Sequence, residues 1–121
     1  AESSAAFVGA LTAPRRLIGS AGLLFESRRK VCHTATLVGM YVMPEHAGCG
    51  IGARLLDACV ELARAEPSVE ILYLTVTSTN SDAIRLYERS GFVAYGLEPR
   101  AMRVGDRTFD KLMMALPLRP A

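Results

Sequence analysis

The sequence contains little cysteine, and its cysteines are not arranged for a shared structural role. Cys32, Cys49 and Cys59 are an odd number and include no C-x-x-C pair. A disulfide framework or a zinc site would need paired spacing, so we expect neither, and we expect no bound metal. Free thiols suit a reducing compartment, which predicts a cytoplasmic protein.

Long apolar runs and broad blocks of like charge are also missing. No stretch reaches the roughly 18–20 apolar residues of a membrane span, and the first residues, AESSAAFVGAL, lack the basic lead of a signal peptide. The formal net charge is +2, and the one basic cluster, Arg28-Arg29-Lys30, is predicted to be a solvated hairpin loop. A nucleic-acid-binding surface would need a wider basic face with interleaved aromatic residues. We therefore expect neither a membrane nor a nucleic acid as a partner.

Half of the 121 residues are hydrophobic, which suffices for a core, and the length suits one domain covering residues 1–121. Three apolar runs joined by short loops predict an antiparallel meander: Phe7–Leu11, Arg16–Glu26 and Thr34–Met43. Gly19 and Gly22, inside the second run, indicate a bulge or a close approach. Pro44 ends the third run because proline cannot continue a ladder of strand hydrogen bonds.

The hydrophobic period then changes from that of a strand to that of a helix. From Gly50 onward, one helical stripe contains Leu55, Leu56, Cys59, Leu62 and Ala63. Residues Glu70–Thr77 are rich in β-branched and aromatic side chains and predict a buried strand. The order strand, helix, strand predicts that the strands on either side of this helix are parallel.

A second helix and a hairpin are predicted for the remainder. Asn80 or Ser81 is expected to cap the helix, and Gly91 is expected to end it, with Phe92 making the hydrophobic contact of a Schellman cap. Two further strands, FVAYGL and FDKLMMALPL, are expected to pair across the turn RVGDR.

Three glycines, Gly48, Gly50 and Gly52, lie between a predicted strand and a predicted helix. That placement directs several backbone N–H groups and the positive end of the helix to one spot, which suits an anion; a turn that binds nothing is the alternative. The loop also matches the dinucleotide fingerprint G-x-G-x-x-A. Residues 44–47 separate the strand from the first glycine, however, and the next strand ends without an acidic residue for a ribose. We therefore do not expect a nicotinamide enzyme.

Two segments carry a resemblance to a known family. Residues 42–53, VMPEHAGCGIGA, resemble the acetyl-CoA-binding motif of the Gcn5-related N-acetyltransferase superfamily, which runs V-x-P and then [Arg/Gln]-x-x-G-x-[Gly/Ala]. Residues 80–92, NSDAIRLYERSGF, are similar to its second motif, N-x-x-A-x-x-L-Y-x-x-x-G-F. The resemblance implies an α/β fold: a mixed, mostly antiparallel sheet with a β-α-β acetyl-CoA-binding core. The chain opens at what resembles the second strand of the family, so we expect the family's first strand and helices to be missing from it.

The resemblance also implies a site for acetyl-CoA. The pantetheine arm would pair with the main chain of Met40, Tyr41 and Val42, where neighbouring parallel strands splay apart. The diphosphate would bind the loop amides of Gly48, Cys49, Gly50, Ile51, Gly52 and Ala53. Asn80 matches a residue that contacts the pantetheine arm, although a helix cap explains it equally well. Tyr87 matches a tyrosine beside the thioester sulfur, where a phenol can protonate the departing thiolate.

Three positions depart from the family pattern. Ala47 and Cys49 stand where basic or amide side chains are common, so charge would have to come from Arg54, Arg85 or Arg89, which could equally be solvated helix residues. Thr75 replaces a glutamate that serves as general base in members that acetylate the N-terminal alanine of a ribosomal protein. A water relay, Glu98, Asp110, His33 or His46 remains as the base.

The expected activity is transfer of an acetyl group from acetyl-CoA to a primary amine by direct attack in a ternary complex. The expected partner is a small-molecule or peptide amine, and a homodimer is open. An acyl-CoA-binding sensor without turnover is the alternative.

Overall fold

The described residues form one six-stranded sheet in the order β1-β2-β3-β4-β6-β5, flanked by two α-helices. The computed structural model describes residues 4–12, 16–26 and 33–120. The elements are β1 (Ser4–Thr12), β2 (Arg16–Phe25), β3 (Thr34–Val42), the 3-10 helix η1 (Pro44–His46), α1 (Ile51–Ala65), β4 (Ile71–Thr77), α2 (Ser81–Arg89), β5 (Val93–Val104) and β6 (Arg107–Pro117). The predicted basic loop and Cys32 lie outside the described residues. None of the described helices is long and apolar enough to cross a membrane.

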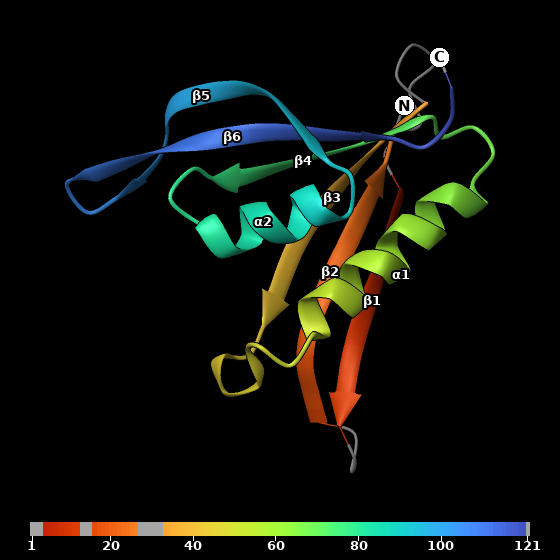
Figure 1. The fold of residues 1–121 in the computed structure, drawn as a ribbon, viewed down its shortest axis with the longest axis horizontal. Helices are drawn as coiled ribbons and strands as arrows, with labels where there is room; N and C mark the ends of the chain where they lie inside the picture. Colours follow the sequence, from red (N-terminus) through yellow and green to blue (C-terminus); the bar gives the residue numbers. More distant parts are fainter. Residues whose placement is uncertain (1–3, 13–15, 27–32, 121) are drawn as a thin grey trace.

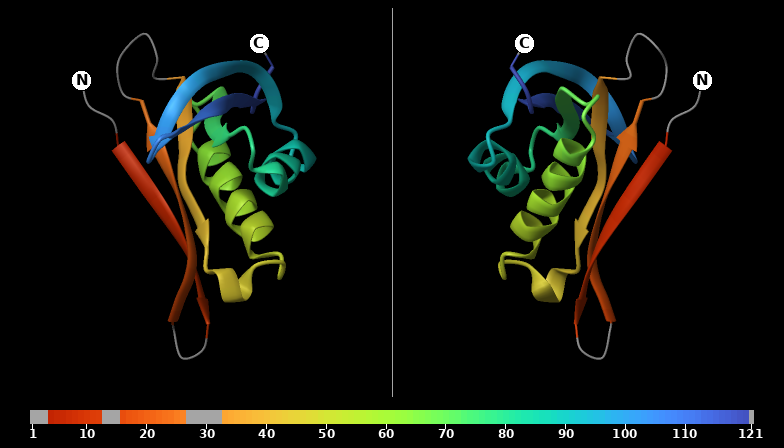
Figure 2. Two further views of the ribbon diagram at one scale, coloured as in Figure 1. Left: turned by 90° about the vertical axis from the view of Figure 1, so that its left-hand side faces the viewer. Right: turned by 90° about the vertical axis from the view of Figure 1, so that its right-hand side faces the viewer.

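The strand directions match the predicted topology. β1, β2 and β3 form an antiparallel meander, and β4, β6 and β5 form a second antiparallel set. β3 and β4 are joined through α1 and pair in parallel. The expected β-α-β unit and the mixed, mostly antiparallel α/β sheet are therefore confirmed. Both helices lie on one face of the sheet (Figures 1 and 2).

The core lies between this sheet face and α1. Four of the five predicted stripe residues of α1 are buried, but Leu62 is 42% exposed, and Val60 is buried instead. At about 100° per residue, Leu62 falls just outside the arc from Leu55 to Val60 that faces the sheet. The periodicity located the apolar face, but the packing of α1 on the sheet decided where its edge falls.

Glycines in β2 allow neighbouring segments to come close, as expected. The register between β2 and β3 shifts between Ser20 and Gly22, which is the predicted bulge. A Cβ on Gly22 would come within 2.6 Å of the ring of Phe7 on β1. A Cβ on Gly19 would come within 3.1 Å of Leu55 on α1. The ring of Phe7 and the side chain of Leu55 therefore both pack closely against glycines of β2.

Both ends of α2 carry the predicted caps. The side chain of Asn80 accepts a hydrogen bond from the Ala83 N–H at 3.3 Å. At the other end, the N–H of Phe92 donates to the Tyr87 carbonyl at 3.1 Å, and Gly91 adopts φ 101°. The rings of Tyr87 and Phe92 meet edge to face, with centroids 5.9 Å apart. This Schellman cap fixes the position of Tyr87 on the last turns of α2.

The closing hairpin is longer than predicted. β5 continues beyond FVAYGL to Val104, with an irregular register between Glu98 and Met102. Inside this bulge Arg100 adopts φ 52°, and its N–H donates to the Asp110 carboxylate at 2.9 Å. Pro99 lies in this bulge, where a strand tolerates a proline.

Candidate functional site

β3 and β4 separate after a short parallel pairing. Their register covers only residues 34–36 of β3 against residues 71–73 of β4. Beyond that point β3 continues alongside β2 and β4 alongside β6, so the two strands point in different directions (Figure 1). The splay expected between the parallel strands is present. Among the described strands, none pairs with the edges of β3 and β4 that face this gap.

The gap between β3 and β4 contains a cavity of about 410 Å³, the splay cavity. Leu74 and Val76 of β4 are buried toward the helices, while Thr75 between them is exposed, as strand alternation requires. The lining is Thr36, Leu37, Val38, Gly39, Met40, Leu74, Thr75, Val76, Thr77, Asn80, Ala83 and Tyr87. Because residues from both faces of β4 line it, the cavity extends between the strands rather than lying on one face.

Tyr87 brings a phenol to the splay cavity. Its side chain is only 6% exposed, and burial raises the pKa of its hydroxyl above the ordinary value. Within the described part of the chain, the Tyr87 hydroxyl has no hydrogen-bond partner. It is not fully buried either, because the described residues include no buried side-chain oxygen without a partner. The hydroxyl therefore keeps some exposure, and Tyr87 lines the splay cavity. A raised pKa keeps the phenol protonated, as a proton donor must be.

The glycine loop lies beside a second cavity of about 780 Å³, the loop cavity, which is lined on its other side by α2. Gly48 and Gly50 both adopt φ 80°, a conformation that side chains disfavour. Gly52 is needed for a different reason, since a Cβ there would come within 3.3 Å of Leu86 on α2. Gly48 and Gly50 therefore give the loop its left-handed backbone conformation, and Gly52 allows α1 and α2 to come into close contact.

The N-terminus of α1 offers unpaired amides to the loop cavity. The first backbone hydrogen bond of the helix runs from the Arg54 N–H to the Gly50 carbonyl at 3.2 Å, and no side chain caps this end. The N–H groups of Ile51, Gly52 and Ala53 thus have no partner within the helix, and all three residues line the cavity. Free amides at the positive end of a fifteen-residue helix are suited to an anion.

Arginines of α2 contribute positive charge to the loop cavity. The loop has an alanine, Ala47, where the family pattern has an arginine or glutamine. Arg85 and Arg89 line the cavity together with the carboxylates of Asp57 and Asp82. Arg85 and Asp82 form an ion pair on the exposed face of α2. The cavity therefore presents two arginines and two carboxylates beside the amides of α1.

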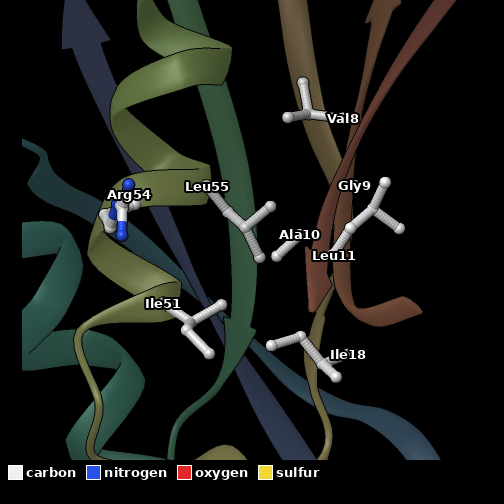
Figure 3. A pocket seen from close by; sticks show the side chains of 8 residues that line it. All are labelled: Val8, Gly9, Ala10, Leu11, Ile18, Ile51, Arg54 and Leu55. Carbon is white, nitrogen blue, oxygen red and sulfur yellow. The ribbon is translucent and has the colours of Figure 1, made fainter. Parts of the chain in front are cut away.

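Arg54, the third arginine considered from the sequence, lines a different cavity. That cavity, about 440 Å³, lies between α1 and the strands β1 and β2. Figure 3 shows Leu55 and Ile51 pointing from α1 toward β1 and β2, with Arg54 on the other side of the helix. Its lining is otherwise apolar or glycine, so the structure favours Arg85 and Arg89 over Arg54 as neighbours of the glycine loop.

The structure places most of the predicted cofactor residues at the two cavities. Met40 and Asn80 line the splay cavity, and Val42, Gly48, Gly50, Ile51, Gly52 and Ala53 line the loop cavity. Tyr41 and Cys49 line neither, and both are exposed. The Cys49 thiol lies 4.0 Å from the Ala47 carbonyl. Among the described residues, no group of acidic, histidine or cysteine side chains could hold a metal ion.

The candidates for a general base are dispersed. Thr75 lines the splay cavity, and His46 lines the loop cavity. Glu98, Asp110 and His33 line neither, and Asp110 is engaged by the Arg100 amide. Sequence reasoning did not identify Ala83, which lines both cavities and marks where they adjoin. The second motif contains this alanine, but only the packing of α2 shows its position.

Three comparisons with known proteins agree with this geometry. The sequence profile described as the acetyltransferase (GNAT) family matches residues 1–92. An L-methionine sulfoximine/L-methionine sulfone acetyltransferase of Pseudomonas aeruginosa is 33% identical over 81 residues, covering 67% of this chain and 46% of that protein. The [ribosomal protein bS18]-alanine N-acetyltransferase of Escherichia coli is 31% identical over 94 residues, covering 78% and 63%. The chain spans about half the length of the first of these relatives.

Solved structures show the same arrangement of strands and helices. The structure of yncA from Salmonella typhimurium, which contains its cofactor acetyl-CoA, is similar with a TM-score of 0.81 and 26% identity, over 89% of this chain and 62% of that one. The ribosomal-protein-S18-alanine N-acetyltransferase of Escherichia coli is similar with a TM-score of 0.83 and 25% identity, over 97% and 71%.

Proposed function

Because the chain belongs to the acetyltransferase (GNAT) family, we propose that it transfers the acetyl group of acetyl-CoA to a primary amine within a ternary complex. The observation that carries this proposal is the adjacency of two cavities that share Ala83. One offers free helix amides to a diphosphate, and the other lies between the splayed strands and is lined by Tyr87. The acetyl-CoA implied by the family requires both features, and the residues present suit it.

The amides and the strand edge provide the donor site. The N–H groups of Ile51, Gly52 and Ala53 donate hydrogen bonds to the diphosphate at the positive end of α1. The unpaired edge of β3 near Met40 and Val42 hydrogen-bonds to the amides of the pantetheine arm like an added strand. Asn80 keeps its side-chain NH₂ free for a carbonyl of the same arm, because only its oxygen is engaged by the Ala83 N–H.

The reaction proceeds by attack of a neutral amine on the thioester carbonyl carbon. A C–N bond forms, the C–S bond breaks, and the proton of the Tyr87 hydroxyl passes to the departing thiolate. The proton that the amine loses then restores the phenol. The raised pKa of Tyr87 keeps this proton in place before the reaction, and binding both substrates in one gap contributes proximity.

The acceptor is a primary amine, carried by a small molecule or by a peptide. The two curated relatives differ in this respect, since one acts on amino-acid analogues and the other on a ribosomal protein. Thr36, Thr75 and Thr77 line the splay cavity with neutral hydroxyl groups. We place the amine beside these threonines, where a hydroxyl oxygen can accept a hydrogen bond from an N–H of the amine.

The test is thiol release from acetyl-CoA across a panel of amines, including amino acids, polyamines and short peptides. Release is expected with at least one amine, and Tyr87→Phe is expected to lower kcat about 10²-fold while leaving CoA affinity unchanged. Equal turnover of both proteins would remove Tyr87 from the chemistry. The second candidate function is an acyl-CoA sensor, favoured by the lack of any carboxylate or histidine among the described residues lining the splay cavity. Tight CoA binding without thiol release for any amine would support it.

A further inference from the structure

The positions of Arg85 and Arg89 on α2 suggest a role beyond that of solvated helix residues. They are four residues apart, so both point along one side of α2, and like charges at this spacing repel each other. The Nε of Arg89 donates to the Arg85 carbonyl at 3.3 Å, which holds its side chain back along the helix beside Arg85. Both side chains line the loop cavity, and with Glu88 they line an adjoining hollow of about 430 Å³. Arg85 already pairs with Asp82, whereas Arg89 has no carboxylate partner among the described residues, so the cluster keeps positive charge for a further anion.

The anion that remains for them is defined by the chemistry of the donor proposed above, on which this inference rests. The diphosphate of CoA is provided for by the amides of α1. The remaining strongly anionic group of CoA is the 3′-phosphate on its ribose, a phosphomonoester with a charge of roughly −1.5 to −2 at neutral pH. A guanidinium can bind two oxygens of such a group at once. The loop positions Ala47 and Cys49 carry no cation that could do so instead.

We propose that Arg85 and Arg89 bind the 3′-phosphate of CoA and that Asp82 holds Arg85 until the phosphate arrives. Arg85 is 61% exposed and its partner Asp82 is 93% exposed, so this ion pair is accessible to a competing ligand. Binding exchanges the Asp82 carboxylate for a phosphate of higher charge. The arrangement makes α2, and not the glycine loop, the element that distinguishes CoA from its dephosphorylated form.

The test measures binding of CoA and dephospho-CoA by calorimetry to the full protein, to R85Q/R89Q and to R103Q/R107Q. The control pair removes the same charge from the β5–β6 hairpin, where Arg103 bonds to Gly105 and Arg107 lies over Phe109. Wild type is expected to prefer CoA about tenfold, R85Q/R89Q to lose this preference, and R103Q/R107Q to keep it. Equal binding of both ligands by wild type, or an unchanged preference in R85Q/R89Q, would overturn the inference.

A further variant, D82N, tests the proposal through a gain of binding, because a loss of binding in R85Q/R89Q could also come from misfolding. Removing the carboxylate frees Arg85, so CoA affinity is expected to rise roughly two- to fivefold, a gain that a misfolded protein cannot show. An unchanged or lower affinity would contradict the proposed exchange. If wild type fails to bind CoA at all, the proposed function fails. If wild type binds CoA but the preference is insensitive to Arg85 and Arg89, only this inference fails.

Discussion

At the scale of single residues, Tyr87 both stabilises the end of α2 and lines the proposed site. Its ring completes the Schellman cap of α2 against Phe92, and the residue lines the cavity between β3 and β4. The cap holds the backbone and the ring contact holds the side chain, so the phenol is positioned without a hydrogen bond to another described residue. A phenylalanine keeps the cap and removes only the proposed proton donor, which is why Tyr87→Phe separates chemistry from folding.

The raised pKa of Tyr87 predicts a loss of stability in alkaline solution. In the unfolded chain this phenol loses its proton near its ordinary pKa of about 10, whereas in the folded protein it holds the proton to higher pH. Above the ordinary pKa the unfolded state binds fewer protons than the folded state, so the contribution of Tyr87 to the free energy of unfolding decreases as pH rises. Denaturant titrations between pH 8 and about 11 should show a shallower decline for Tyr87→Phe than for wild type. Identical pH profiles would show that Tyr87 titrates as it does in the unfolded chain.

Some residue positions could not be assigned from the sequence, for physical reasons. Leu62 and Val60 differ by only two positions, and only the packing of α1 on the sheet shows that Val60 belongs to the core. Arg54, Arg85 and Arg89 were equivalent as isolated cations, and only the packing of α2 beside the glycine loop distinguished them. Cys49 stands within the glycine motif, yet it lines neither of the two site cavities.

At the scale of elements, local signals predicted the order and most ends of the helices and strands. The caps at Asn80 and Gly91 and the strand end at Pro44 all depend on neighbouring residues, which a sequence shows directly. The β5 bulge was missed because Arg100 has no local preference for a positive φ. Its conformation depends on Asp110, ten residues away on β6, which accepts the Arg100 N–H.

The end of α2 should be more sensitive to a side chain than the hairpin turn. Gly91 has φ 101°, and a Cβ there would come within 3.1 Å of Leu116; Gly105 has φ 63° with open space around it. Gly91→Ala is expected to lower the free energy of unfolding by about 2 kcal/mol, and Gly105→Ala by about 1 kcal/mol. Urea unfolding of both variants measures the difference. A larger loss in Gly105→Ala would show that the α2 cap does not constrain the fold as described.

At the scale of the whole molecule, the proposed function depends on two interruptions of otherwise regular structure. The sheet opens where β3 and β4 diverge after residue 36, and α1 begins with amides that nothing in the described chain caps. The close contact of Gly52 with Leu86 brings α1 and α2 together, so that the two cavities adjoin at Ala83. The family resemblance predicted both features from two motifs, but their adjacency follows only from the folded chain.

The most direct measurement is a crystal structure of the protein with CoA bound. The account predicts a diphosphate within hydrogen-bonding distance, about 3 Å, of the N–H groups of Ile51, Gly52 and Ala53. It also predicts the sulfur in the splay cavity beside the Tyr87 hydroxyl. A diphosphate bound elsewhere, or a sulfur that lies outside the gap between β3 and β4, would contradict it.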